Sequence, residues 1–286
     1  MIKNNGIALI QVLVLTTILM IVAVFFSKTA KEQVNFSSQF QSLAKASVEL
    51  HSVANLTLFN LLTFEKKPND TYPANLLGYQ ETWNYHGAPF QASEYATVSL
   101  QDMRGLLNLN YPNQQRVLQV LTSYGLSHYD AKLFYDTLVD YQSVEEGLQR
   151  RNGGAQYKHG ALNSAFELAN VTDDLKLIHF FEENSTVFKS SSFNPMTAPD
   201  ALLMLLLPSQ EFRGIKLLRD AKQLSSKAFS DITMIQENSG IILYPSNNYR
   251  ISISVDINGT KVVKTYYYLL KPAKTNPVEL VSVKIK

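Results

Sequence analysis

The most constraining feature of the chain is an uncharged apolar run of 20 residues near its amino terminus, Ile7 to Phe26, with the sequence IALIQVLVLTTILMIVAVFF. A helix of that length spans roughly 30 Å, which is the thickness of the hydrocarbon core of a bilayer. A secretory signal peptide has a shorter apolar region, about 7 to 15 residues, followed by a cleavage site between small residues. The run therefore predicts a single membrane-spanning helix.

The charges beside this run do not fix its orientation. Lys3 and the amino terminus precede it, while Lys28 and Lys31 follow it. The positive-inside rule therefore favours neither direction. On hydropathy alone, a plain uncleaved membrane anchor stays an alternative.

Composition excludes several classes of function. The 26 basic and 24 acidic residues leave a formal charge of +2, too small for a nucleic-acid footprint or a broadly basic membrane-binding surface. The chain has no cysteine, which excludes disulfides, thiolate metal sites and cysteine nucleophiles. Its histidines lack zinc-like spacing, and no phosphate loop, dinucleotide fingerprint or hydrolase motif occurs. We expect neither an enzyme nor a nucleic-acid-binding protein.

The segment after the apolar run predicts a continuing helix. Residues 28 to 64 contain no proline or glycine, and the side chains at gaps of three or four residues form one face, apolar except at Ser47. That face predicts an amphipathic half that lies on a sheet, although a core helix of a separate domain would show the same pattern. Its members are Phe36, Phe40, Leu43, Ser47, Leu50, Ala54, Leu58 and Leu61.

Strand patterns lie on both sides of a helical middle. Residues 72 to 109 show short strands and turns, and four apolar runs occupy residues 240–244, 249–255, 262–270 and 278–285. Ile251, Ile253 and Val255 alternate with serines, which predicts a half-buried antiparallel meander. Residues 111 to 226 carry clustered leucines in a helical pattern. The predicted fold class is α+β, a long N-terminal helix packed on an antiparallel sheet, with a large all-helical insertion.

The polar segment before the apolar run, MIKNNG, ends in Gly6 and resembles a prepilin leader. This resemblance implies that a prepilin peptidase cuts after Gly6 and that Ile7 becomes a methylated amino terminus on the cytoplasmic face. Most pilin-like subunits have glutamate at the fifth mature position, where this chain has Gln11. An amide cannot neutralise the terminal amine of a neighbouring subunit as a carboxylate does.

Four further segments, in order and spacing, are similar to general secretion pathway protein K, a minor pseudopilin of bacterial type II secretion systems. Among pseudopilins, the K type lacks the membrane glutamate, in agreement with Gln11. The most specific segment is similar to the family pattern D-x-x-G-x-x-N-L-N. The four are Val98 to Asn110, Asp136 to Tyr141, Leu162 to Val171 and Phe193 to Leu203.

The resemblance implies a domain plan and a set of partners. The plan is a leader at 1–6, a transmembrane helix at 7–26, an amphipathic continuation at 27–64, a pilin-like β region at 65–110 and 227–286, and an inserted helical domain at 111–226. The implied partners are the I- and J-type minor pseudopilins, the pseudopilus, prepilin peptidase, the inner membrane and secreted proteins. Subunit contacts are expected through Gln11, Phe36, Phe40, Leu43 and Leu50.

The same resemblance implies a location and a function. The chain would be a single-pass protein of the bacterial inner membrane with its C-terminal domain in the periplasm, and it would sit at the pseudopilus tip after assembly. There it would initiate filament assembly and support protein export across the outer membrane. The alternatives are a minor pilin of a type IV pilus or competence system and an anchored periplasmic binding domain.

Two local expectations concern the polar residues of these segments. Asn108, Asn110 and Asn194 are expected to bond neighbouring backbone in turns, and Thr197 or Asp200 to cap the following helix. Calcium, which the family's insertion can hold, prefers six to eight oxygen ligands. Here the carboxylates at that place are few, and we expect no cofactor and at best a weak calcium site. Its candidate ligands are Asp140, Glu145 and Glu146.

Overall fold

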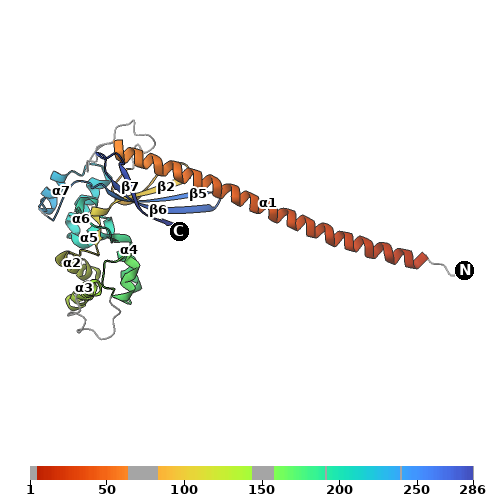
Figure 1. Ribbon diagram of the computed structural model, residues 1–286, viewed down its shortest axis with the longest axis horizontal. Coiled ribbons are helices and arrows are strands. Elements are labelled where there is room, and N and C mark those ends of the chain that lie inside the picture. The colour runs from red at the N-terminus through yellow and green to blue at the C-terminus, as the bar shows by residue number, and fades with distance from the viewer. Residues whose placement is uncertain (1–4, 64–82, 144–157, 191, 239, 286) are drawn as a thin grey trace.

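The computed structural model describes residues 5–63, 83–143, 158–190, 192–238 and 240–285, with side chains from residue 9 onward. Its longest element is helix α1, Asn5–Thr63, which is one continuous helix of 59 residues (Figure 1). By length and composition α1 can cross a membrane, and its most apolar window is entirely uncovered by the rest of the chain. The two predicted helical segments are therefore a single helix, because no proline or glycine interrupts them after residue 6.

The C-terminal half of α1 lies on a five-stranded antiparallel sheet in the order β1, β2, β5, β6, β7. The turn between β5 and β6 contains Asn258 and Gly259 with φ of 53° and 79°. This pair of positive φ values is the one that a tight two-residue hairpin needs. The predicted meander is confirmed. The strands are β1 His86–Gln91, β2 Ala96–Asp102, β5 Asn248–Ile257, β6 Thr260–Leu270 and β7 Val278–Ile285.

The first hydrophobic core lies between α1 and this sheet. Alternate residues of β5, Tyr249 to Ile257, are buried, and they form one cluster with Ala46, Leu50, Val53 and Leu61 of α1. The apolar face predicted for α1 is correct only in part. Buried positions on α1 begin at Ser42 and include Leu50, Ala54 and Leu61, whereas Phe36, Phe40 and Leu43 are exposed.

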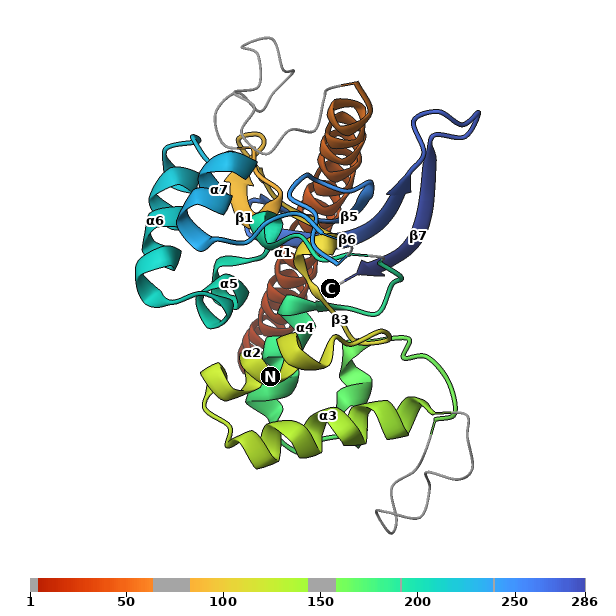
Figure 2. The same cartoon turned by 90° about the vertical axis from the view of Figure 1, so that its left-hand side faces the viewer.

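A second core belongs to the helical region, which lies beyond and beside the sheet, away from the apolar end of α1 (Figures 1 and 2). Its cluster extends from Leu107 to Leu243 and includes Phe229 of α7. The helical region is therefore longer than the predicted 111–226. Its elements are α2 Gln114–Tyr124, α3 His128–Gln142, α4 Leu175–Asn184, α5 Asp200–Leu206, α6 Ser209–Asp220 and α7 Ser226–Thr233.

Short elements complete the described chain. The 3-10 turns are η1 Met103–Gly105, η3 Ala165–Asn170 and η4 Pro195–Thr197, and a two-residue parallel pair joins β3 Leu107–Asn108 to β4 Ser185–Thr186. The strand predicted at 240–244 is wrong. Ile241 forms only isolated bridges there, to Phe193 and Asn238, because this segment packs against the helices rather than the sheet.

Candidate assembly surface and the junction between sheet and helices

The first candidate functional surface is the uncovered part of α1. Its side chains from Leu9 to Gln41 are almost all exposed, and those up to Phe26 are apolar around the whole circumference apart from Gln11 and two threonines. The hydroxyls of Thr16 and Thr17 donate to the carbonyl of Leu13, so the helix itself satisfies them. Such a surface is stable only in lipid or against other apolar helices.

The predicted assembly residues fall into two groups. Gln11, Phe36, Phe40 and Leu43 are exposed and available to a neighbouring subunit. Leu50 is fully buried against the chain's own sheet, and its prediction as an assembly contact is therefore wrong. Both groups follow the same helical period, so periodicity alone could not separate the part of the face that its own sheet covers.

The leader junction and the calcium candidates are only partly described. The backbones of Gly6 and Ile7 lie in the first turns of α1, and their side chains are outside the described residues. Asp140 lies near the end of α3, where its carbonyl accepts the amide of Ser143. Glu145 and Glu146 lie outside the described residues. Within the described ranges, no three acidic or histidine side chains gather as metal ligands would.

The second candidate site is the junction where the sheet meets the helices, centred on Asp102 at the end of β2. Its buried carboxylate accepts hydrogen bonds from the amides of Arg104 and Ser246, both at 3.0 Å, from the Thr197 hydroxyl at 3.2 Å and from the Ser246 hydroxyl. Burial raises the pKa of Asp102, and these hydrogen bonds oppose the rise. One carboxylate thus joins three segments that are distant in sequence.

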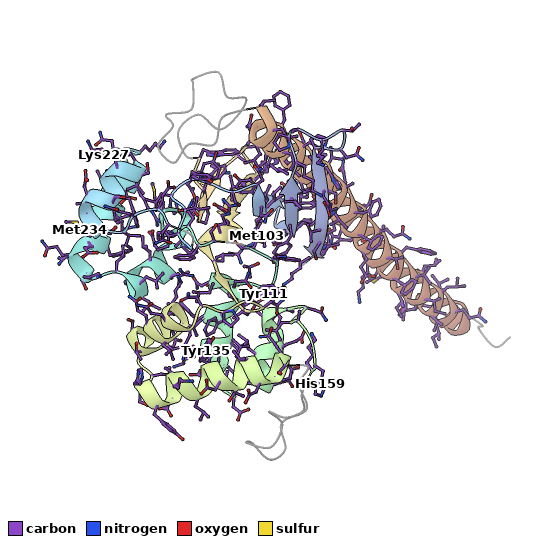
Figure 3. The ribbon with its side chains drawn as sticks, turned by 60° about the vertical axis from the view of Figure 1, so that its left-hand side comes forward. Met103, Tyr111, Tyr135, His159, Lys227 and Met234 are labelled. Atoms are coloured by element: carbon purple, nitrogen blue, oxygen red, sulfur yellow. The ribbon has the colours of Figure 1, made fainter. Side chains whose placement is uncertain are left out.

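Two neighbouring backbones approach closely at the same point, at Gly105, two residues after Met103, which is labelled in Figure 3. A Cβ atom on Gly105 would lie 2.2 Å from the carbonyl oxygen of Thr197. The amide of Asn194 donates to the carbonyl of Arg104 at 2.8 Å, and the side chain of Gln101 donates to the Thr197 carbonyl at 2.8 Å. The first and last of the four segments that are similar to protein K, at residues 98–110 and 193–203, therefore contact each other. Sequence order alone could not show this contact.

Arg219 of α6 fixes the turn that carries Thr197. Its guanidinium, almost wholly buried, pairs with Asp200 at 2.6 Å and donates to the carbonyls of Met196 and Ala198, both at 2.9 Å. Asp200 therefore binds cations of α6, while the N-cap of α5 is Pro199, which has no side-chain bond. The prediction that Thr197 or Asp200 caps this helix is wrong, because tertiary partners occupy both side chains.

The turn predictions for Asn108 and Asn194 are confirmed, whereas the one for Asn110 is wrong. The side chain of Asn194 accepts the amide of Met196 within η4, and Asn108 accepts the amides of Asn110 and Tyr111. Asn110 instead reaches across the helical region and donates to the carbonyls of Leu162 and Val187. The second and third of these segments, at residues 136–141 and 162–171, are also in contact, because Asn170 donates to the Tyr141 hydroxyl at 3.0 Å.

His86 of β1 lies in the same electrostatic environment. Burial, together with the positive charge of Arg219, lowers its pKa from 6.5 to about 3. Between these values the folded chain binds fewer protons than the unfolded chain. The stability that neutral His86 contributes is therefore complete above pH 6.5 and is lost as the pH falls towards 3.

This shift predicts acid sensitivity. Between pH 7.5 and pH 5, protonation of His86 in the unfolded chain should lower the free energy of unfolding by up to about 2 kcal/mol. Urea unfolding of the full chain in nonionic detergent measures this change. In a His86→Gln variant, the fall in unfolding free energy between these pH values should be smaller by the same amount. The raised pKa of Asp102 acts in the opposite direction in both proteins, so the difference between them isolates the histidine. Equal losses in the two proteins would contradict the prediction.

No protein-family model matches the sequence, and no curated protein matches it. Among solved structures, a chain of the GspK–GspI–GspJ complex from the type 2 secretion system of enterotoxigenic Escherichia coli matches with a TM-score of 0.54 and 13% sequence identity. The alignment covers 90% of this chain and 99% of that chain.

The fold is GspK-like. Coverage of 90% leaves out too few residues to omit either the sheet or the helical region, so the GspK-like fold includes both. The resemblance inferred from the four segments is thus confirmed for the fold.

Proposed function

We propose that this protein is a minor pseudopilin of a type II secretion system and that it occupies the tip of the pseudopilus, where it starts assembly rather than extending the shaft. The observation that carries the proposal is the GspK-like fold over nearly the whole chain. Its partners would be the I- and J-type minor pseudopilins, by analogy with the complex in which the matching chain was solved. Its role would be association, without a catalytic step.

The uncovered surface of α1 supports membrane anchoring and lateral assembly. An apolar helix that its own subunit does not cover needs either lipid or the helices of neighbouring subunits. In the proposed function α1 rests in the inner membrane with the sheet and helices in the periplasm, and it later moves into the filament. The exposed Phe36, Phe40 and Leu43 would then contact other pseudopilins.

Two features support a tip position. The helical region extends sideways from the sheet and away from α1, which would obstruct a subunit stacked above it (Figure 1). Gln11 offers a neutral amide where shaft subunits offer a carboxylate to the amine of their neighbour. Both features disfavour repeated stacking. A single terminal subunit has no subunit above it and needs no carboxylate for a neighbour's amine.

Immunogold labelling of sheared pseudopili tests the position. We expect label at one end of each filament and substoichiometric abundance relative to the major subunit. Deleting the protein should reduce the number of pseudopili and the secretion rate, while any filaments that form keep a normal shaft. Label along the shaft, or abundance equal to the major subunit, would rule out the tip position. Co-purification with type IV pilins instead of pseudopilins would assign the protein to a type IV pilus rather than to a type II secretion system.

A further inference from the structure

Two adjoining hollows lie on the helical region, where the start of α2 faces the segments around residues 190 and 240. The smaller hollow, of about 170 Å³, is bordered by β3, Tyr111 and Ser192, and Figure 3 labels Tyr111 at this place. The larger hollow, of about 320 Å³, has a mixed lining, in which Leu206, Leu207 and Ile241 lie beside polar side chains such as Gln115 and Gln119. Four residues, Asn113, Arg116, Phe193 and Gly240, line both hollows and form the wall that the hollows share.

The Arg116 guanidinium has no anionic partner in this wall. It stacks on the Phe193 ring at 4.1 Å from the ring centroid, and among the described residues its side chain makes no ion pair or hydrogen bond. Burial lowers the pKa of Arg116 to about 10, with no carboxylate to oppose the fall. Arg219, the comparable buried arginine of the junction, is paired with Asp200. An arginine left without such a partner retains unused donors for a carboxylate.

Two further observations point to the same hollow. Ser192 borders the smaller hollow, and its buried hydroxyl oxygen makes no hydrogen bond within the part of the chain that the structure describes. Buried polar atoms are normally paired, and a turn of this side chain toward a ligand oxygen in the hollow would supply the missing partner. The first turn of α2 contains no acidic residue, and its amide end adds positive potential beside Arg116.

The arrangement matches a group that carries a carboxylate and an apolar side chain on one carbon atom. The carboxylate would fit the smaller hollow, against Arg116 and Ser192. The side chain would enter the larger hollow against leucine and isoleucine walls. The last residue of a polypeptide has this combination, whereas an internal acidic residue carries its carboxylate away from any apolar side chain.

We propose that these two hollows bind the C-terminal carboxylate of a partner polypeptide whose last side chain is apolar. Arg116 supplies the fork of donors, Phe193 holds the guanidinium in place, and the leucine and isoleucine side chains of the larger hollow select the last side chain. The proposal does not depend on the position of the protein in a filament. It concerns a surface on the helical region, apart from the uncovered face of α1.

The test measures fluorescence anisotropy of a short labelled glycine–serine peptide that ends in leucine, with the full chain in nonionic detergent. The free-acid peptide should bind at least about tenfold more tightly than the same peptide with an amidated terminus. Arg116→Gln should remove this preference, and Arg116→Lys should reduce it, because lysine lacks the planar fork. Arg213→Gln, on the surface of α6, is the matched control and should retain it.

Circular dichroism melting of each variant separates loss of binding from loss of folding. A preference that survives in a folded Arg116→Gln variant would overturn the proposal, as would equal affinity for acid and amide. Absence of binding by the free-acid peptide at millimolar concentration would overturn it too. If an amidated peptide with an internal glutamate binds as tightly as the free acid, the site recognises acidic side chains, and its assignment to a C-terminal carboxylate is wrong.

Discussion

Replacing Gly105 with alanine should lower the unfolding free energy by roughly 3 kcal/mol, because the added Cβ has no space. It would lie 2.2 Å from the oxygen and 2.4 Å from the carbon of the Thr197 carbonyl. These are backbone atoms, so no side-chain rotation relieves the overlap. The Thr197 backbone is itself held by Gln101 and by the bond of its hydroxyl to Asp102. The clash would therefore separate the sheet from the helical region.

Guanidinium unfolding of the full chain in nonionic detergent measures this effect. Trp83, the one tryptophan of the chain, lies in the core between α1 and the sheet and reports the unfolding of that part by fluorescence. Gly160→Ala is the matched control, since a Cβ at that position meets no atom within 4 Å. The control should change stability by less than about 0.5 kcal/mol. A Gly105→Ala variant as stable as this control would refute the proposed close contact.

Replacing Gly6 with leucine should abolish processing of the leader, if the proposed function holds. The prepilin peptidase expected for this chain cuts after a glycine, and a large side chain there would obstruct the approach of an extended backbone to the enzyme. The wild-type protein should therefore have an intact mass that begins at a methylated Ile7. The Gly6→Leu variant should retain Met1, and secretion should fall with it.

Asn5→Ala is the control for this experiment, because it changes the same leader without altering the residue before the cut. It should be processed as the wild type is. A wild-type product that retains Met1, or one cut after residue 26, would count against the pseudopilin proposal. Normal processing of Gly6→Leu would show that a different peptidase acts.

The junction shows where reasoning from the sequence was incomplete. Asn194 was expected to bond its own turn, and it does, but its amide also donates to Arg104 across the junction. Thr197 was expected to act locally and instead donates to Asp102, 95 residues earlier in the chain. A short polar motif before a helix has the same appearance in both cases, since the sequence does not show which distant segment lies beside it.

The same limit applies to Arg116. Its sequence context suggests only the exposed first turn of a helix. The structure places it over Phe193, 77 residues later, at the border of a hollow that Ser192 also lines. An isolated arginine in a sequence gives no signal of this kind, because its lack of an ionic partner among the described residues depends on where distant segments lie.

The sequence by itself determined the long helix, the antiparallel meander and the helical character of the middle, because these depend on local hydrophobic periodicity and on turn residues such as Asn258 and Gly259. Only the tertiary structure decided which half of the α1 face is covered, since Leu43 and Leu50 follow the same period but only Leu50 meets the sheet. The tertiary structure also decided that Asp102, Gly105 and Thr197 meet at the junction between the sheet and the helices. Contacts of this kind depend on distances between segments far apart in the chain, which no local pattern encodes.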